Sequence, residues 1–237
     1  MASLTAKPRR RTQSSITLSY LDIKGFAEPI RLALAIGHVP FEDRRVSYED
    51  VARMRRDGML PYGQVPLLEV DGVRHGQSGA ILRWAGRKAG LYPLTDENAM
   101  LTIDATMETI ADIHKCLIPA WYKHACGRSP STGQLYDRTK LKDEQNEGVF
   151  EALNNDILPV RFKQLDTAMV SSGGPFLCGS TMTVADLSLY VLMCGIQDGS
   201  FCSGVSPNVL NSCPYLLELL QRVAHIPEVA MWESAHQ

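Results

Sequence analysis

Alternating and helical patterns of apolar residues follow one another in the first part of the chain. Residues 16–20 alternate apolar and polar side chains, which predicts a strand, and residues 27–36 repeat apolar positions at helical spacing. Gly37 is suited to end that helix, and residues 41–46 predict a second strand. The order strand, helix, strand indicates a βαβ unit with parallel strands.

The clearest turn in the sequence is Asp71-Gly72, which separates two apolar stretches. A two-residue type I′ turn requires positive φ at both central positions, so Asp-Gly predicts a β-hairpin here. Pro66 cannot donate a hydrogen bond to a sheet and is therefore expected to open the first strand. The Val65-Pro66 bond is a candidate for the cis form, with the Val65 backbone facing outward, although base rates favour the trans form.

A helix with an apolar face is predicted from Ser78 to Gly90. Residues 48–59 are charged and only weakly amphipathic, which predicts an irregular helix or a long loop. The order β-α-β, connector, β-β-α defines residues 16–90 as a small four-stranded α/β domain.

The rest of the chain has helical periodicity. Residues 91–98 contain a proline and have no period, so they are expected to link the first domain to a second at residues 99–237. Apolar residues at spacings of three and four along residues 100–117 predict a long amphipathic helix that Pro119 ends or bends.

Further helices are predicted at residues 143–169, with a bend near Pro159, and along the apolar stripe of residues 216–223. The one strand-like feature expected in this half is a turn-rich piece at residues 176–178. The second domain is therefore predicted to be all-helical.

A capping motif marks the start of the most apolar helix. Thr183 and Asp186 have the spacing of a capping box, with Asp where Glu or Gln is usual. The helix that follows is apolar on nearly all sides, which is typical of the core of a domain. Asp186 is therefore assigned a structural role.

Composition narrows the class of protein. The chain has 237 residues, 45% of them hydrophobic, and a formal net charge of -2, which gives no electrostatic footprint for nucleic acid. No apolar run reaches the roughly 18 residues of a membrane span, so no membrane association is expected. The six cysteines form no Cys-x-x-Cys pair and are interpreted as reduced thiols of a cytoplasmic protein. The six histidines lack ligand spacing, so no metal site is predicted.

Residues 1–15 form a basic segment with Arg, Lys, Ser and Thr and no acidic residue. Such a segment cannot bury enough apolar surface to order itself, so a disordered tail is predicted. An organelle-targeting peptide has a similar composition, but the short length of the segment favours the disordered tail.

Several motifs, in this order and at this spacing, resemble those of cytosolic glutathione transferases. They are Leu18-Ser19-Tyr20, residues 25–31, residues 62–66, Gln77-Ser78 and the cap at residues 183–186. The resemblance covers nearly everything from Ile16 onward and is strongest to the sigma class, which includes prostaglandin D synthases and lens S-crystallins. It implies an α/β plus all-α fold, with a thioredoxin-like domain (βαβ-ββα) followed by an all-helical C-terminal domain.

Tyr20 is the catalytic candidate that the resemblance implies. A glutathione thiol resembles free cysteine, with a pKa of about 8.5, so it is mostly protonated at neutral pH. A hydrogen bond donated to the thiolate favours the charged form, and a neutral tyrosine hydroxyl can donate one. From the residues alone, a residue that merely packs at the end of a strand is the favoured interpretation of Tyr20.

The resemblance also implies a set of glutathione-binding residues. Gln77 and Ser78 begin a helix, where backbone N–H groups favour an anion such as the γ-glutamyl carboxylate. Val65 would pair its backbone with the cysteinyl part. The remaining assignments are Pro66 beside Val65, Gln64 and Arg55 near the glycyl end, and Asp112, which in sigma-class relatives reaches the other subunit's glutathione in a homodimer.

The second substrate is expected over Tyr20, against the long helix. Four residues are assigned to its site: Ile113, Leu117, Trp121 and Tyr122. These apolar side chains imply small hydrophobic electrophiles without identifying one, and an apolar helix face is also typical of a core.

Two departures from the family pattern bear on the chemistry. Many Tyr-type relatives have an arginine where this chain has Phe26, so the support of the thiolate is in doubt unless Lys24 or Arg31 compensates. The connector between Phe41 and Tyr62 is also longer than expected, so the glycyl end has a different environment.

The leading hypothesis is an enzyme that adds the glutathione thiolate to hydrophobic electrophiles, with glutathione as co-substrate and no metal. The alternatives are a glutathione-dependent isomerase of prostanoid-like lipids and a non-catalytic structural or ligand-carrying relative. A Cys-type transferase is disfavoured because the first cysteine is Cys116, far from the first strand.

Overall fold

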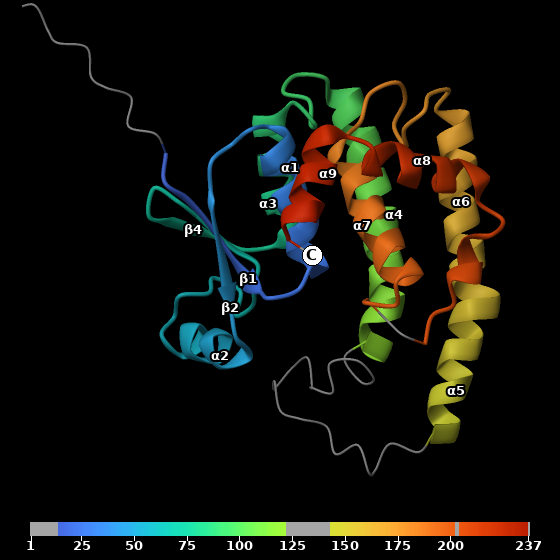
Figure 1. Cartoon of the computed structure of the whole chain (residues 1–237), viewed down its shortest axis with the longest axis horizontal. Coiled ribbons are helices and arrows are strands. Elements are labelled where there is room, and N and C mark those ends of the chain that lie inside the picture. Colours follow the sequence, from blue (N-terminus) through green and yellow to red (C-terminus); the bar gives the residue numbers. More distant parts are fainter. Residues whose placement is uncertain (1–13, 122–142, 202–203, 237) are drawn as a thin grey trace, which may run out of the picture.

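The computed structural model describes residues 14–121, 143–201 and 204–236. An N-terminal sheet with three helices adjoins a larger array of helices (Figure 1). The sheet consists of β1 (Ile16–Leu21), β2 (Glu42–Val46), β3 (Leu67–Val70) and β4 (Val73–His75) in the order β2-β1-β3-β4.

The strand directions agree with the sequence analysis. β1 and β2 are parallel, as the βαβ pattern predicts, whereas β3 is antiparallel to both β1 and β4. The β3–β4 hairpin is confirmed, because Asp71 and Gly72 have φ values of 50° and 83°. The Val65-Pro66 peptide bond is cis.

Two of the three helices of this half lie between the sheet and the second half (Figure 1). They are α1 (Glu28–Ile36) and α3 (Ser78–Ala89), which pack against each other. The third, α2 (Tyr48–Arg56), is a regular helix, although the sequence left residues 48–59 as an irregular helix or a loop.

The regularity of α2 comes from its N-terminal cap. Ser47 Oγ accepts a hydrogen bond from the Asp50 backbone N at 3.1 Å, and the Asp50 carboxylate accepts one from the Ser47 backbone N at 3.0 Å. This reciprocal pair satisfies two N–H groups that the start of a helix otherwise leaves without partners. The signal was present in the sequence as Ser-x-x-Asp.

The second half is helical in all of its regular elements among the described residues. Its long helix α4 (Glu97–Trp121) continues past Pro119. The predicted bend near Pro159 corresponds to a π-helical segment, Leu153–Ile157, between two helices. The remaining helices are α5 (Asp143–Ala152), α6 (Leu158–Ser171), α7 (Val184–Gln197), α8 (Pro214–Ala224) and α9 (Pro227–Ala235). None of the helices in the described ranges has a stretch long and apolar enough to cross a membrane.

The two halves share one hydrophobic core, which is built around α7. Ten of its residues are buried, and the helix contacts α1, α3, α4 and α8. α9, which the sequence analysis did not predict, packs on α1 and α8. The domains are therefore held together by the packing of α1 against α7 and α9.

Asp186 fixes the start of this central helix, as expected. Its carboxylate accepts hydrogen bonds from Thr183 N at 2.7 Å, Thr183 Oγ1 at 2.9 Å and Leu177 N at 2.8 Å. The residue has no exposed surface, so these bonds replace its hydration.

Replacing Asp186 by Ala is expected to lower the free energy of unfolding by about 2 to 4 kcal/mol, because two backbone N–H groups lose their acceptor in a buried site. Asp198 lies at the other end of α7, is exposed, and accepts one hydrogen bond from Ser200 N. Asp198→Ala is the matched control and is expected to change stability by less than about 1 kcal/mol. Urea unfolding followed by circular dichroism measures both, and equal losses would contradict the structural role of Asp186.

Candidate functional site

Tyr20 lies near the end of β1, with its side chain buried in the core. Its hydroxyl oxygen accepts a hydrogen bond from the backbone N–H of Phe26 at 3.2 Å. An N–H group that donates to a hydroxyl oxygen polarises it, which makes the hydroxyl a better hydrogen-bond donor. The loop after β1 therefore both positions and activates this hydroxyl.

Gly25 permits that close approach. Its φ is +45°, and a Cβ atom added to it would lie 2.7 Å from the Tyr20 Oη. A side chain at position 25 would therefore be strained and would displace the hydroxyl. Both constraints require glycine here.

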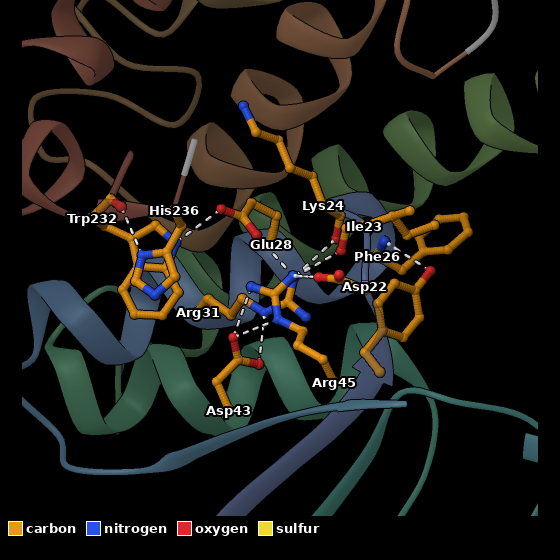
Figure 2. Close-up of polar contacts among 11 residues, drawn as sticks. Asp22, Ile23, Lys24, Phe26, Glu28, Arg31, Asp43, Arg45, Trp232 and His236 are labelled. Carbon is orange, nitrogen blue, oxygen red and sulfur yellow. Dashed lines mark hydrogen bonds and ion pairs between the residues drawn. The ribbon is translucent and has the colours of Figure 1, made fainter. Parts of the chain in front are cut away.

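The loop is held by Arg31, which has no exposed surface. Arg31 Nη1 donates to the carbonyl oxygens of Ile23 at 3.0 Å and Lys24 at 3.3 Å (Figure 2). The guanidinium also lies 5.8 Å from the centroid of the Tyr20 ring. Arg31 thus fixes the backbone immediately before Gly25.

Two carboxylates compensate the buried charge of Arg31. Glu28 accepts from Nη1 at 2.9 Å, and Asp43 on β2 accepts from Nε at 3.0 Å (Figure 2). The other oxygen of Glu28 accepts from Trp232 Nε1 at 2.9 Å. Because Trp232 lies on α9, the network that positions the loop extends into the helical domain.

The predicted glutathione-binding residues lie around the same end of the sheet. Ser19 on β1 is paired with Leu67 on β3, so Pro66 and Val65 continue alongside Tyr20 and the residue after it. Pro66 is buried, Val65 is half-buried and Gln64 is exposed. This stretch therefore borders the Tyr20 end of the sheet.

Gln77 and Ser78 form the entry to α3, as the sequence analysis expected. Ser78 is the first residue of the helix, and Gln77 has φ 73°, a conformation that non-glycine residues rarely adopt. Such strain often marks a binding site. The N-terminal turn of α3 offers backbone N–H groups suited to a carboxylate.

Arg55 contacts the same region from α2. Its Nε donates to the carbonyl oxygen of Gly63 at 2.6 Å, and its side chain is exposed. The residue thus fixes the backbone next to Gln64.

Asp112, in contrast, lies on α4 and accepts a hydrogen bond from Lys115 Nζ at 2.8 Å. That bond lowers the pKa of Asp112, which keeps the half-exposed carboxylate ionised.

The residues predicted for the second substrate do not form an exposed site among the described residues, unlike those predicted for glutathione. Ile113 and Leu117 have no exposed surface and belong to the core, so they contact no ligand in this conformation. Trp121 is the last described residue of α4, and Tyr122 lies outside the described residues. The four substrate assignments therefore stay predictions.

His114 is a residue near Tyr20 that the sequence analysis did not assign to the site. Its ring lies 4.9 Å from the ring of Phe26, the residue whose backbone donates to Tyr20. The sequence signal was a lone histidine within the apolar stripe of the long helix, which is more often a packing residue.

Among the described residues, no three His, Cys, Asp or Glu side chains are grouped so that they could hold a metal ion. At this end of the sheet the Tyr20 hydroxyl, the exposed Gln64 amide and the backbone N–H groups at the start of α3 suit an anionic, peptide-like ligand.

Comparison with known proteins identifies the family. The profile "Glutathione S-transferase, C-terminal domain" matches residues 131–236. Glutathione S-transferase A3 of Mus musculus is 30% identical over 213 residues, 90% of this chain and 85% of that protein. Glutathione S-transferase alpha-5 of Rattus norvegicus has the same identity and the same coverage. The chain belongs to the glutathione S-transferase family, whose members use glutathione as a co-substrate.

The solved structures agree with the fold. Prostaglandin synthase D of Nilaparvata lugens superposes with a TM-score of 0.75 at 25% identity, over 93% of this chain and 97% of that one. The expected thioredoxin-like domain followed by a helical domain is thereby confirmed. The rat relative is an alpha-class protein, so the sigma-class assignment stays a prediction.

Arg31 and Arg45 provide a matched test of the network around Tyr20, since both pair with Asp43. Replacing Arg31 by Leu is expected to lower the free energy of unfolding by about 3 to 5 kcal/mol, because the buried partner carboxylates lose their counter-charge. Arg45 is partly exposed, with 27% of its side-chain surface accessible. Arg45→Leu is expected to lower it by less than about 1 kcal/mol. Urea denaturation of both variants checks this, and a mild effect of Arg31→Leu would contradict the role given to the buried guanidinium.

Proposed function

We propose that this protein conjugates the thiolate of glutathione to small hydrophobic electrophiles, with Tyr20 donating a hydrogen bond to the thiolate. The observation that carries the proposal is the Tyr20 hydroxyl, held by the Phe26 N–H beside the Val65-Pro66 stretch. A thiolate stabilised in this way and held against an electrophile needs only proximity to react.

Glutathione binding in this proposal uses the residues at the end of the sheet. The γ-glutamyl carboxylate binds the N–H groups at the start of α3, with Gln77 and Ser78. The cysteinyl part pairs with the backbone of Val65, and the glycyl end lies towards Gln64 and Arg55. The support is the common location of Val65 and Gln64 at the Tyr20 end of the sheet and the bond from Arg55 to Gly63.

The proposal includes a cytoplasmic homodimer in which Asp112 reaches the glutathione amine of the other subunit. The support is the family membership and the exposed, ionised carboxylate of Asp112. A negatively charged group suits a protonated amine.

Because position 26 is Phe and not Arg, the proposed site lacks a cation at this position. Arg31 and Lys24 are two nearby cations that could compensate. Arg31 is committed to Glu28 and Asp43 and is fully buried. Lys24 lies in the loop with an exposed side chain. In this proposal the Tyr20 hydroxyl is therefore the principal support of the thiolate, and a smaller lowering of the thiol pKa follows than in relatives with an arginine.

A second candidate is glutathione-dependent isomerisation of a prostanoid-like lipid. It is favoured by the similarity to prostaglandin synthase D of Nilaparvata lugens. The two activities share the thiolate and differ in whether glutathione stays attached to the product, so product analysis by mass spectrometry separates them.

Tyr20→Phe tests the shared step. We expect the thiol pKa of bound glutathione, followed by thiolate absorbance in the ultraviolet, to lie below the free value of about 8.5 in the wild type and to return towards it in the variant. Each unit of that shift corresponds to about 1.4 kcal/mol of preferential thiolate stabilisation. Tight binding with an unshifted pKa in the wild type would exclude the mechanism and favour a non-catalytic, ligand-carrying role.

Gly25→Ala tests the placement of the hydroxyl. Both Gly25 and Gly72 have positive φ, but a Cβ at Gly72 meets no atom within 4 Å. Alanine should therefore destabilise the fold by about 1 kcal/mol at either position through backbone strain. Only Gly25→Ala should reduce the rate of conjugation, by about tenfold or more, since it alone displaces Tyr20 Oη. Similar rates in the two variants would mean that the exact placement of the hydroxyl is unimportant.

A further inference from the structure

His114 lies beside the proposed thiolate site and has no role in the proposed mechanism. Its ring is flanked by Phe26 at 4.9 Å and by Phe201 at 5.6 Å, the latter in an edge-on arrangement. The residue is partly exposed, whereas its neighbour Ile113 has no exposed surface. Of these two residues of α4, His114 is therefore the one that contacts Phe26 and retains accessible surface.

The hydrogen bonding of His114 defines its protonation. Its Nδ1 lies 3.1 Å from the carbonyl oxygen of Ile110. Because a carbonyl can only accept, Nδ1 carries a proton, and in the neutral ring Nε2 is then an acceptor with a lone pair. Burial lowers the pKa of His114 to about 4, although the bond to Ile110 acts in the opposite direction. The ring is neutral at physiological pH.

Nε2 is consequently an acceptor without a partner in the part of the chain that the structure describes. The flanking aromatic rings limit its contact with water, and a hydrogen bond made in such surroundings is stronger than one made in water. Phe26 links His114 to the proposed thiolate site. Its ring contacts the ring of His114, and its backbone N–H donates to the Tyr20 hydroxyl.

We propose that His114 Nε2 accepts a hydrogen bond from a hydroxyl or N–H group of the second substrate. The preferred electrophiles are then those that carry such a donor a few bonds from the reacting carbon. This inference rests on the proposed function, because it requires glutathione to be bound beside Tyr20. It makes His114 a specificity-determining residue for the second substrate.

His114 is a poor candidate for a proton-accepting base. A thiol with a pKa of about 8.5 does not readily give its proton to a ring with a pKa of about 4. A hydrogen bond from a substrate hydroxyl needs no proton transfer. The neutral ring is suited to recognise a donor on the substrate.

The test uses glutathione conjugates as ligands, so it does not depend on turnover. S-hexylglutathione is compared with three hydroxylated analogues. These are isomers of one another that carry a hydroxyl on the second, third or fourth carbon of the hexyl chain. Dissociation constants are measured by calorimetry for the wild type, His114→Met and His114→Gln. Met has a similar volume and no strong acceptor, whereas Gln retains an acceptor oxygen. Thr102→Val, at an exposed position on the same helix, is the control.

The informative quantity is the affinity of a hydroxylated ligand relative to S-hexylglutathione. For at least one isomer we expect this ratio to fall about 3- to 10-fold in His114→Met, the effect of one hydrogen bond. The ratio should be largely retained in His114→Gln and unchanged in Thr102→Val. A loss specific to the hydroxylated ligand is not expected from a residue that only packs.

Two results would overturn the inference alone. The first is an affinity ratio that is the same in the wild type and His114→Met for every isomer. The second is an equal loss of that ratio in His114→Met and His114→Gln. The second result would assign the effect to the shape of the pocket. Failure of the wild type to bind S-hexylglutathione at all would instead remove the proposed function, and the inference would fall with it.

Discussion

The buried guanidinium of Arg31 is the interaction on which the site depends. A charge without exposed surface is strongly unfavourable unless counter-charges and hydrogen bonds surround it. Nε and Nη1 of Arg31 are satisfied by Glu28, Asp43 on β2 and the carbonyl oxygens of the loop after β1, while Nη2 has no hydrogen-bond partner among the described residues. Glu28 in turn accepts from Trp232 on α9, so both domains contribute to one network. The position of Tyr20 relative to its loop is a consequence of this arrangement.

The same loop determines what lies around the Tyr20 hydroxyl. Where many relatives have an arginine, Phe26 supplies a backbone N–H to the hydroxyl and an aromatic ring to His114. Compared with an arginine, Phe26 therefore places an aromatic ring where a cationic side chain would be, while its backbone N–H is one that any residue except proline has. The side proposed for the thiolate is therefore less positive, while the side proposed for the second substrate contains an unpaired imidazole nitrogen among the described residues.

The sequence predicted the elements whose signals are local. Asp71-Gly72 identified the hairpin and Thr183 with Asp186 identified the start of α7, because each motif satisfies its own backbone. The sequence does not decide between a helix and a loop for α2 because its apolar face is narrow, although Ser47 and Asp50 have the spacing of a cap. α9 was missed because its stability comes from packing on α1 and α8 and not from an apolar stripe.

The bond between Glu28 and Trp232 spans 204 positions in the chain, and no pattern in either segment indicates it. His114 was passed over for the same reason, since only the fold places it against Phe26.

The hydrogen bond from Phe26 to Tyr20 has an experimental consequence of its own. A backbone amide proton is visible in nuclear magnetic resonance spectra, and its chemical shift responds to the acceptor it faces. Because the acceptor here is the phenolic oxygen, the Phe26 amide signal reports on the electronic state of the hydroxyl. A single resonance of the main chain thus reports directly on the Tyr20 hydroxyl, without any label on the ligand.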